Sequence, residues 1–305
     1  MPVAAALLVG LLTAAQSRLN SELSHAFGNP LEAAVWSFGS GLAVLGVAVA
    51  LSPPLRRGLR RVATAVRAGG LRWWQLLGGV LGGFFVGVQS AVVPLVGVAI
   101  FTVGTVAGQS VNAVVVDRVG LGPAGVQAVT VRRLVSAALA IVAVVIAVSG
   151  RLGGSSFSVV PVALAVLAGC GIAVQQALNG RVAIAANGPM PSSVLNFAFG
   201  TVGLVAALAV TTVADGSTLH PVGGAPWWSY LGGVVGIVFI TLAAWVVPLI
   251  GVLLFALLSI AGQLTAALLL DLLAPTPGAS VGWNLVAGLV LAFVAVSVAA
   301  RGRRR

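Results

Sequence analysis

The stretch WWQLLGGVLGGFFVGVQSAVVPLVG, residues 73–97, decides the fold because the chain repeats it at residues 227–251 as WWSYLGGVVGIVFITLAAWVVPLIG. The similarity extends over residues 73–123 and 227–277, which are identical at 21 of 51 positions without a gap. The abundance of Val and Leu inflates such a count, but it does not account for the matched Trp, Pro, Gln and Asp residues. The two segments are therefore copies of one unit.

A second match shows that the duplication includes the N-terminal part of the chain. Residues 16–41 resemble residues 175–200 at a shift of 159, whereas the first match has a shift of 154. The paired residues include Gln, Asn, Pro, Phe and Gly. The sequence therefore predicts two homologous halves, one at residues 1–150 and one at residues 151–305, which ends in an Arg-rich tail.

The composition requires a lipid environment. Of the 305 residues, 59% are hydrophobic and only 7% are charged, whereas soluble domains carry about 25% charged residues. A spanning helix needs about 20 mostly apolar residues. We expect an all-α integral membrane protein with ten transmembrane helices. The predicted spans are residues 2–22, 31–52, 72–90, 92–116, 131–149, 157–179, 191–213, 227–246, 248–271 and 282–300.

Very tight turns near Pro94 and Pro248 are expected to separate two pairs of these spans. Without a turn, the segment from Leu71 to Asp117 would form one helix of roughly 67 Å. That length is about twice the hydrocarbon core of a bilayer. Two spans are therefore the better interpretation of each segment.

The arginines predict the orientation. All sixteen cations are Arg, and fourteen of them fall in the even-numbered loops and the tail, which are cytoplasmic if the N-terminus is cytoplasmic. Only Arg18 and Arg151 fall on the other side. Cytoplasmic loops are enriched in Arg, so we expect a multi-pass protein of the bacterial inner membrane with both termini in the cytoplasm. Because the arginines lie between apolar runs, we expect no nucleic-acid partner.

The two halves are expected to face opposite ways across the membrane. Each half has five spans, an odd number, so the second half enters from the other side. The Arg-rich loop 53–71 has its counterpart at 214–226, which has no Arg and contains Asp215 and His220. Such inverted repeats are typical of secondary transporters, whose substrate site lies near the midplane between the repeats.

Paired amide side chains inside the predicted spans are the candidate substrate-binding residues. Within each half, one Gln and one Asn are four residues apart and share a helix face, and a further Gln follows a glycine. The candidates are Gln16, Asn20, Gln109, Asn112, Gln175, Asn179 and Gln263. An amide in lipid needs a partner, which is either a neighbouring helix or a solute. Interhelical hydrogen bonds are worth about 0.6 kcal/mol on average, and the two roles can coexist.

Some polar residues lack a counterpart. Asn112 corresponds to Ala266, so we expect any asymmetry of the site to begin there. Gln89 and Ser90 are weaker candidates, since Ala243 and Ala244 replace them in the second half.

The carboxylates lie at helix ends rather than in the middle of spans. Asp117 and Asp271 end their predicted helices on opposite membrane faces, where a carboxylate opposes the helix dipole. We expect a gate or a polar network at the mouth of the site. A salt bridge of Asp117 with a nearby Arg and direct proton coupling are the alternatives. Glu32 follows Asn29 and Pro30 and is expected to belong to a helix N-cap.

Aromatic and small residues have structural interpretations. Trp73, Trp74, Trp227 and Trp228 are expected to anchor the chain at the membrane interfaces. Trp36 and Trp245 lie deeper, where a ring could also stack on a ligand. The glycine ladder from Gly78 to Gly87, in steps of four residues, favours close helix packing.

The sequence lacks several kinds of site. No carboxylate lies at the centre of a predicted span, so a small neutral, zwitterionic or anionic solute is favoured over a lipophilic cation. The sequence shows no metal-binding cluster, no nucleophile–base pair and no nucleotide-binding motif. We therefore expect neither an enzyme nor a cofactor.

The motifs resemble those of a known family. Gln16-x-x-x-Asn20, a short loop to Pro30 and Phe38-x-x-Gly41, together with Gly-Gln followed by Asp eight residues after the Gln, are similar to the YdcZ-like family of the drug/metabolite transporter (DMT) superfamily. The resemblance covers about residues 1–300. Because single-copy members resemble one half, it implies a fused pair of five-helix units. It also implies an EamA-like fold with a cavity lined by the first, third, fourth, sixth, eighth and ninth spans. Arg118-Val119 departs from the expected His-Phe.

The leading hypothesis is a secondary transporter of small metabolites that works by alternating access between the inverted halves. The alternative is a non-transporting membrane assembly or regulatory protein, whose amides would be fully paired between helices. The expected partners are the lipid bilayer and a small-molecule solute. A homodimer is one assembly that the sequence allows.

Overall fold

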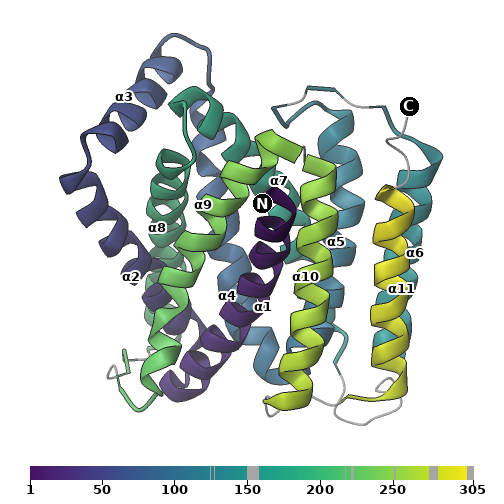
Figure 1. Cartoon of the computed structure of the whole chain (residues 1–305). Helices are drawn as coiled ribbons and strands as arrows, with labels where there is room; N and C mark the ends of the chain where they lie inside the picture. Colours follow the sequence, from purple (N-terminus) through teal and green to yellow (C-terminus); the bar gives the residue numbers. More distant parts are fainter. Residues whose placement is uncertain are drawn as a thin grey trace.

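A computed structural model describes residues 1–123, 125–126, 128–149, 158–216, 218–220, 223–250, 252–274 and 281–300. Within these ranges all regular structure is helical (Figure 1). The α-helices are α1 (Pro2–Phe27), α2 (Pro30–Leu51), α3 (Pro53–Arg67), α4 (Gly78–Val96), α5 (Val98–Arg118), α6 (Val131–Ser149), α7 (Val160–Ala186), α8 (Met190–Asp215), α9 (Gly232–Ile250), α10 (Val252–Leu273) and α11 (Trp283–Ala300). Short 3₁₀ helices, η1 (Trp73–Leu77) and η2 (Trp227–Leu231), precede α4 and α9.

Each predicted span coincides with an α-helix, but the count of ten membrane crossings remains a prediction. In the described part of the chain, seven helices are long and apolar enough to cross a membrane. Shorter apolar stretches of 10–17 residues lie in α6, α10 and α11. The structure also contains α3, which falls where the sequence analysis placed only an Arg-rich loop. This helix was missed because its apolar residues, at positions 55, 59, 62 and 66, are too few to form a span.

Local sequence explains where the helices begin and end. The Asn29 Oδ1 atom accepts hydrogen bonds from the backbone N–H groups of Leu31 (2.9 Å) and Glu32 (3.3 Å), which confirms the predicted N-cap of α2. The turn between α4 and α5 lies later than predicted. Helix α4 continues through Pro94 and ends at Gly97, whose φ of 86° suits a residue without a side chain. A proline in the last turn removes little of the helix, so it does not end α4.

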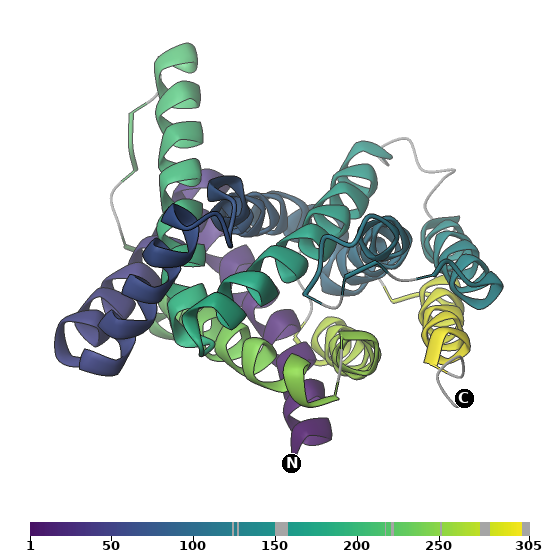
Figure 2. The same cartoon turned by 90° about the horizontal axis from the view of Figure 1, so that it is seen from above.

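Helices of one half pack mainly on helices of the other half. Helix α5 lies along α7, and α10 lies along α1. Helix α4 contacts α7 and α8, and α9 contacts α1 and α2. Helices α6 and α11 form a separate pair at one end of the molecule, as Figures 1 and 2 both show. Each of these contacts therefore has a counterpart between the corresponding helices of the repeat.

Glycines set the closest of these approaches. A Cβ atom at Gly108 of α5 would lie 1.9 Å from the carbonyl oxygen of Val166 in α7. A Cβ atom at Gly262 of α10 would lie 2.2 Å from that of Leu7 in α1. These residues correspond at shifts of 154 and 159. Small residues let helix backbones approach closely in membranes, so the same packing device recurs in both halves.

Corresponding residues also meet each other. The rings of Phe38 and Phe197 lie 4.9 Å apart, centre to centre. Each ring fills the space beside a glycine of the opposite helix, Gly200 and Gly41 respectively. Phe38 and Phe197 correspond to each other at a shift of 159. Their contact therefore lies on the pseudo-twofold axis that relates the two halves.

Candidate functional site

The amides of α1 face helix α9. The side chains of Gln16 and Asn20 are 2% and 0% exposed. The Gln16 Nε2 group donates a hydrogen bond of 2.8 Å to the carbonyl oxygen of Gly232. A Cβ atom at Gly232 would lie 2.6 Å from Asn20 Oδ1, and one at Gly236 would lie 2.7 Å from Gln16 Nε2. The two amides therefore occupy the space that these glycines leave open.

The amides of α7 repeat the arrangement against α4. A Cβ atom at Gly78 would lie 3.0 Å from Asn179 Oδ1, and one at Gly82 would lie 2.3 Å from Gln175 Nε2. Gln175 is buried and its Nε2 group donates a hydrogen bond of 2.8 Å to Asn196 Oδ1. Asn179 is only half-buried. The amides of each half thus lie against glycines of the other half, although the second pair is more accessible.

Helix α4 adds an amide that α9 lacks. The Asn20 Nδ2 group donates to Gln89 Oε1 at 2.8 Å, and the Gln89 Nε2 group donates to Ser17 Oγ at 2.5 Å. All three side chains are fully buried. The counterpart of Gln89 is Ala243, so no equivalent bridge can form between α7 and α9. Gln89 is a weak candidate from the sequence because it has no counterpart, yet in the structure it is hydrogen-bonded to Asn20.

Buried acceptors and hydroxyls remain around these amides. Gln16 Oε1, Asn20 Oδ1, Ser37 Oγ, Ser90 Oγ and Thr102 Oγ1 are buried and have no hydrogen-bond partner among the described residues. Leaving such a group unpaired costs about 1–3 kcal/mol. Asn20 Oδ1 and Ser37 Oγ both lie within 3 Å of the position that a Cβ atom at Gly232 would take.

The remaining candidates lie on α5 and α10. The Asn112 Nδ2 group donates 2.7 Å to the carbonyl oxygen of Cys170 in α7. Cys170 Sγ in turn lies 3.4 Å from the carbonyl oxygen of Gly108. Gln109 is half-buried, whereas Gln263 is 6% exposed. Asn112 therefore links α5 to α7. It does not join the hydrogen bonds among Ser17, Asn20 and Gln89 between α1 and α4.

Asp271 caps a helix of the other half. Its carboxylate oxygens accept hydrogen bonds from the backbone N–H groups of Val98 (3.0 Å) and Ala99 (2.7 Å), at the start of α5. The residue before α5, Gly97, is at the N-cap position and has no side chain that could cap the helix. A carboxylate is stabilised at a helix N-terminus, which resolves the unfavourable position of Asp271 at the end of α10. Its counterpart Asp117 is half-buried at the end of α5.

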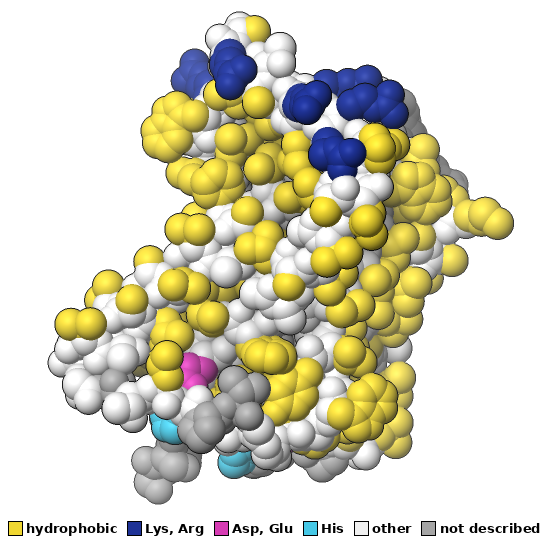
Figure 3. Space-filling model, turned by 90° about the vertical axis from the view of Figure 1, so that its left-hand side faces the viewer, with side chains coloured by type: hydrophobic (Ala, Val, Ile, Leu, Met, Phe, Trp, Pro, Cys, Tyr) yellow, Lys and Arg dark blue, Asp and Glu magenta, His cyan; other side chains and the backbone are white. Residues whose placement is uncertain are grey.

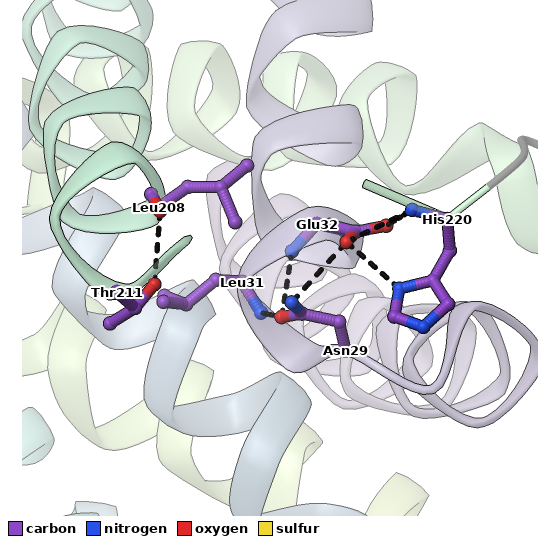
Figure 4. A network of polar contacts seen from close by, with 6 residues as sticks. All are labelled: Asn29, Leu31, Glu32, Leu208, Thr211 and His220. Atoms are coloured by element: carbon purple, nitrogen blue, oxygen red, sulfur yellow. Dashed lines mark hydrogen bonds and ion pairs between the residues drawn. The ribbon is translucent and has the colours of Figure 1, made fainter. Parts of the chain in front are cut away.

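Charged groups also link the loops to the helix ends. The Glu32 carboxylate accepts from the His220 backbone N–H, lies 3.0 Å from His220 Nδ1 and accepts from Asn29 Nδ2 (Figure 4). Sequence reasoning assigned Glu32 to the helix cap and did not foresee this contact over 188 residues. Arg18 pairs with Glu22 within α1, and their spacing of four residues is the signal that could have revealed the pair.

Three comparisons with known proteins bear on identity. The family model described as "Putative inner membrane exporter, YdcZ" matches residues 1–146 and 160–298, so it finds both halves. A search of curated proteins found no match. Ten chains of solved structures match. One crystal structure covers 100% of this chain and 96% of its own, with a TM-score of 0.59 and 22% sequence identity, a likeness that shows the fold alone. The chain belongs to the YdcZ-like family of the drug/metabolite transporter superfamily, as two fused copies of the family unit.

Proposed function

We propose that the protein is a secondary transporter that moves a small neutral, zwitterionic or anionic metabolite across the inner membrane by alternating access between its two halves. Membership of a family of inner membrane exporters supports transport in general. The observation that carries the mechanism is the reciprocal packing, in which α1 lies on α9 and α10 while α7 lies on α4 and α5. Inverted repeats that exchange equivalent contacts are the basis of alternating access.

In this proposal the halves span the membrane ten times, in opposite orientations, with both termini cytoplasmic. The arginine distribution supports that orientation. Figure 3 shows Arg side chains gathered at one end of the molecule, with acidic and His side chains towards the other. The contact of Phe38 with Phe197 supplies a pivot, because it joins corresponding residues and changes least when the halves rock against each other.

The proposed substrate site is formed by the amides on α1 and α7. Gln16 and Asn20 carry buried acceptor oxygens without a partner among the described residues, and Asn179 is the more exposed of the two Asn residues. A solute would therefore reach Asn179 before Asn20. It would enter between α7 and α9, where Ala243 replaces Gln89 and no amide bridge joins the described residues of the two helices. Amides bind neutral and zwitterionic groups and also donate to carboxylates.

The proposed gates are Asp271 and Asp117. Asp271 fastens the end of α10 to the start of α5, two helices of different halves. If the halves rock, these hydrogen bonds must break or shift. By the repeat, Asp117 would serve the opposite membrane face.

A flux experiment tests the proposal. A thermal-shift screen of the purified protein against a metabolite library supplies a solute, and its uptake is then measured in proteoliposomes. We expect Asn20→Ala combined with Asn179→Ala to abolish flux while the protein still reaches the membrane. Asn187→Gly is the matched control, since Asn187 is exposed and has a φ of 56°, which glycine adopts freely. Unchanged flux in the double variant would exclude these residues from the site.

One observation favours the alternative of a non-transporting membrane protein. The amide N–H groups of Gln16, Asn20, Asn112 and Gln175 all donate to other protein groups. In that case the amides only join helices, and the double variant would lower the unfolding temperature while no solute in the library binds or crosses.

A further inference from the structure

Helix α3 is held to the protein along one face. Leu55 and Val62 are 5% and 3% exposed. Gly58 lies against the start of α8, where a Cβ atom would approach Pro191 Cγ to 2.5 Å. Val62 also belongs to a buried cluster with Val182 of α7. Helix α3 follows α2 in the first half but packs on the turn between α7 and α8 in the second half.

The opposite face of α3 carries cations that the protein does not neutralise. Residues 53–72 contain six arginines and no acidic residue. Arg56 donates to two carbonyl groups in the last turn of α2, a favourable place for a cation. Arg57, Arg60 and Arg61 are exposed, and no carboxylate in the described ranges pairs with them. Three guanidinium groups on adjacent turns are therefore available to an anion.

The surface beside these arginines is hollowed. An open hollow of about 480 Å³ is lined by Arg57, Arg60, Arg61, Thr64, Ala65 and Ala68. A second, of about 320 Å³, shares Ala65 and is mainly apolar, with Leu71 and Ile184 in its wall. Its one arginine, Arg181, already donates to two backbone carbonyl groups of the loop after α5. A cationic hollow beside an apolar one suits a molecule with an anionic head and an apolar body.

The end of α3 lies close to residues that favour the headgroup region of a bilayer. Arg72 is exposed and is followed by Trp73, which is 67% exposed. Trp rings are enriched at the membrane–water interface. The arginines of α3 are therefore within reach of lipid phosphates, unlike a basic patch on a soluble domain.

We propose that the Arg face of α3 binds the headgroup of an anionic phospholipid. A guanidinium group can donate two parallel hydrogen bonds to one phosphate, and Thr64 adds a hydroxyl in the same hollow. The bound lipid would hold α3 at the membrane surface. Through Gly58 and Pro191 it would also hold the α7–α8 turn of the second half. The headgroup site is formed by α3 and does not involve the amides of α1 and α7, so it stands or falls separately from the proposed transport.

The test is a titration of phosphatidylglycerol against the full-length protein in neutral detergent micelles, with bound lipid counted by native mass spectrometry. Phosphatidylcholine is the neutral reference. A basic residue near an anionic surface contributes about fivefold in affinity, so we expect the variant Arg57→Gln/Arg60→Gln/Arg61→Gln to bind roughly 100-fold more weakly. The matched control, Arg301→Gln/Arg303→Gln/Arg304→Gln, removes the same charge from another part of the sequence and is expected to bind as the wild type does.

Two further measurements keep the proposal testable if the triple glutamine variant does not fold. The lysine variant at the same three positions keeps the charge but loses the paired donors of the guanidinium groups, so it should bind more tightly than the glutamine variant and more weakly than the wild type. Raising NaCl from 50 to 500 mM should weaken binding by the wild type, since exposed charges are screened. Equal binding of phosphatidylglycerol and phosphatidylcholine would overturn the proposal. So would displacement of the lipid by 10 mM inorganic phosphate, because the site would then be one for small free anions.

Discussion

Helices α4 and α9 descend from the same repeated segment, yet they occupy different environments. In its most apolar 18-residue window, 67% of the residues of the α4 segment are buried, against 28% for the α9 segment. The difference coincides with a few positions at which the two helices differ. Helix α4 has Gln89, Ser90 and Gly83 where α9 has Ala243, Ala244 and Ile237. Polar and small residues let α4 sit at the centre of the bundle, where Gln89 bridges to α1, whereas α9, which also packs on α1, stays more exposed.

The two copies have kept the glycines that set the distances between helices, whereas single side chains determine which pairs of helices are joined by hydrogen bonds. The glycines opposite the amides are kept in both copies, Gly78 with Gly232 and Gly82 with Gly236. The bridge through Gln89 exists only between α1 and α4. The packing of α7 on α9 lacks this bridge and is less extensive, which fits the proposal that the protein opens between these two helices.

Among the predicted changes, replacing Gly83 of α4 by the Ile that its counterpart, Ile237, supplies in α9 should have the largest effect on stability. A Cβ atom at Gly83 would lie 2.8 Å from the carbonyl oxygen of Gly200, so Gly83→Ile forces α4 away from α8. We expect a loss of about 3 kcal/mol, at the upper end of overpacking effects, seen as aggregation or a much lower melting temperature in fluorescence-detected size exclusion. Ile237→Gly is the reciprocal control and should leave a folded protein. Equal tolerance of both would mean that burial does not distinguish α4 from α9.

Removing the bridging amide should have the next largest effect. Gln89→Ala makes α4 resemble α9 and leaves the Asn20 amide nitrogen without its acceptor, at a cost of about 1–3 kcal/mol. Thermal unfolding in detergent measures this cost. The reverse substitution, Ala243→Gln, places an amide between α9 and α7 and should slow solute flux without lowering stability. Faster flux in Ala243→Gln would contradict the assignment of the open side.

The carboxylate cap of α5 should contribute less. Asp271→Asn keeps the shape but removes the charge, and interactions of charged groups with helix termini are worth about 0.3–2 kcal/mol. We expect a small fall in melting temperature and a larger change in flux, because the cap joins the two halves. Asp271→Ala, which removes the cap, should lower stability further. If Asp271→Asn leaves flux unchanged, Asp271 has only a structural role.

The smallest effect is expected at the loop contact of Glu32. Glu32→Gln weakens the contact with His220; the His220 side chain is 51% exposed and that of Glu32 is 9% exposed, and a contact with one exposed partner is expected to contribute no more than about 1 kcal/mol. A melting-temperature change within the error of wild type would fit this expectation. His220→Ala is the paired variant, and the two changes should not add, because they remove the same contact.

The helices and their correspondence between the halves could be predicted from the sequence. The lengths of apolar runs, the spacing of glycines and the duplicated residues can all be recognised without knowing which residues are in contact. The sequence located the helices that correspond to the spans and paired Gln16 with Gln175. It did not predict α3, since an amphipathic helix of fifteen residues looks like a charged loop when spans are sought. It also could not find the contacts of Asp271 with Val98 or of Glu32 with His220. These contacts join residues more than 170 positions apart, and no spacing rule relates such partners.

The cap on α5 has a consequence for how the protein is made. A ribosome produces α5 long before it produces Asp271, and Gly108 and Gly262 have their partners in the half that does not contain them. Until α7 and α10 have been synthesised, the first half has an uncapped helix end at α5 and glycine surfaces without their partner helices. Its assembly therefore cannot be completed before α10 has been made. Two fragments divided between the halves would be expected to need each other to mature, as separately encoded subunits do.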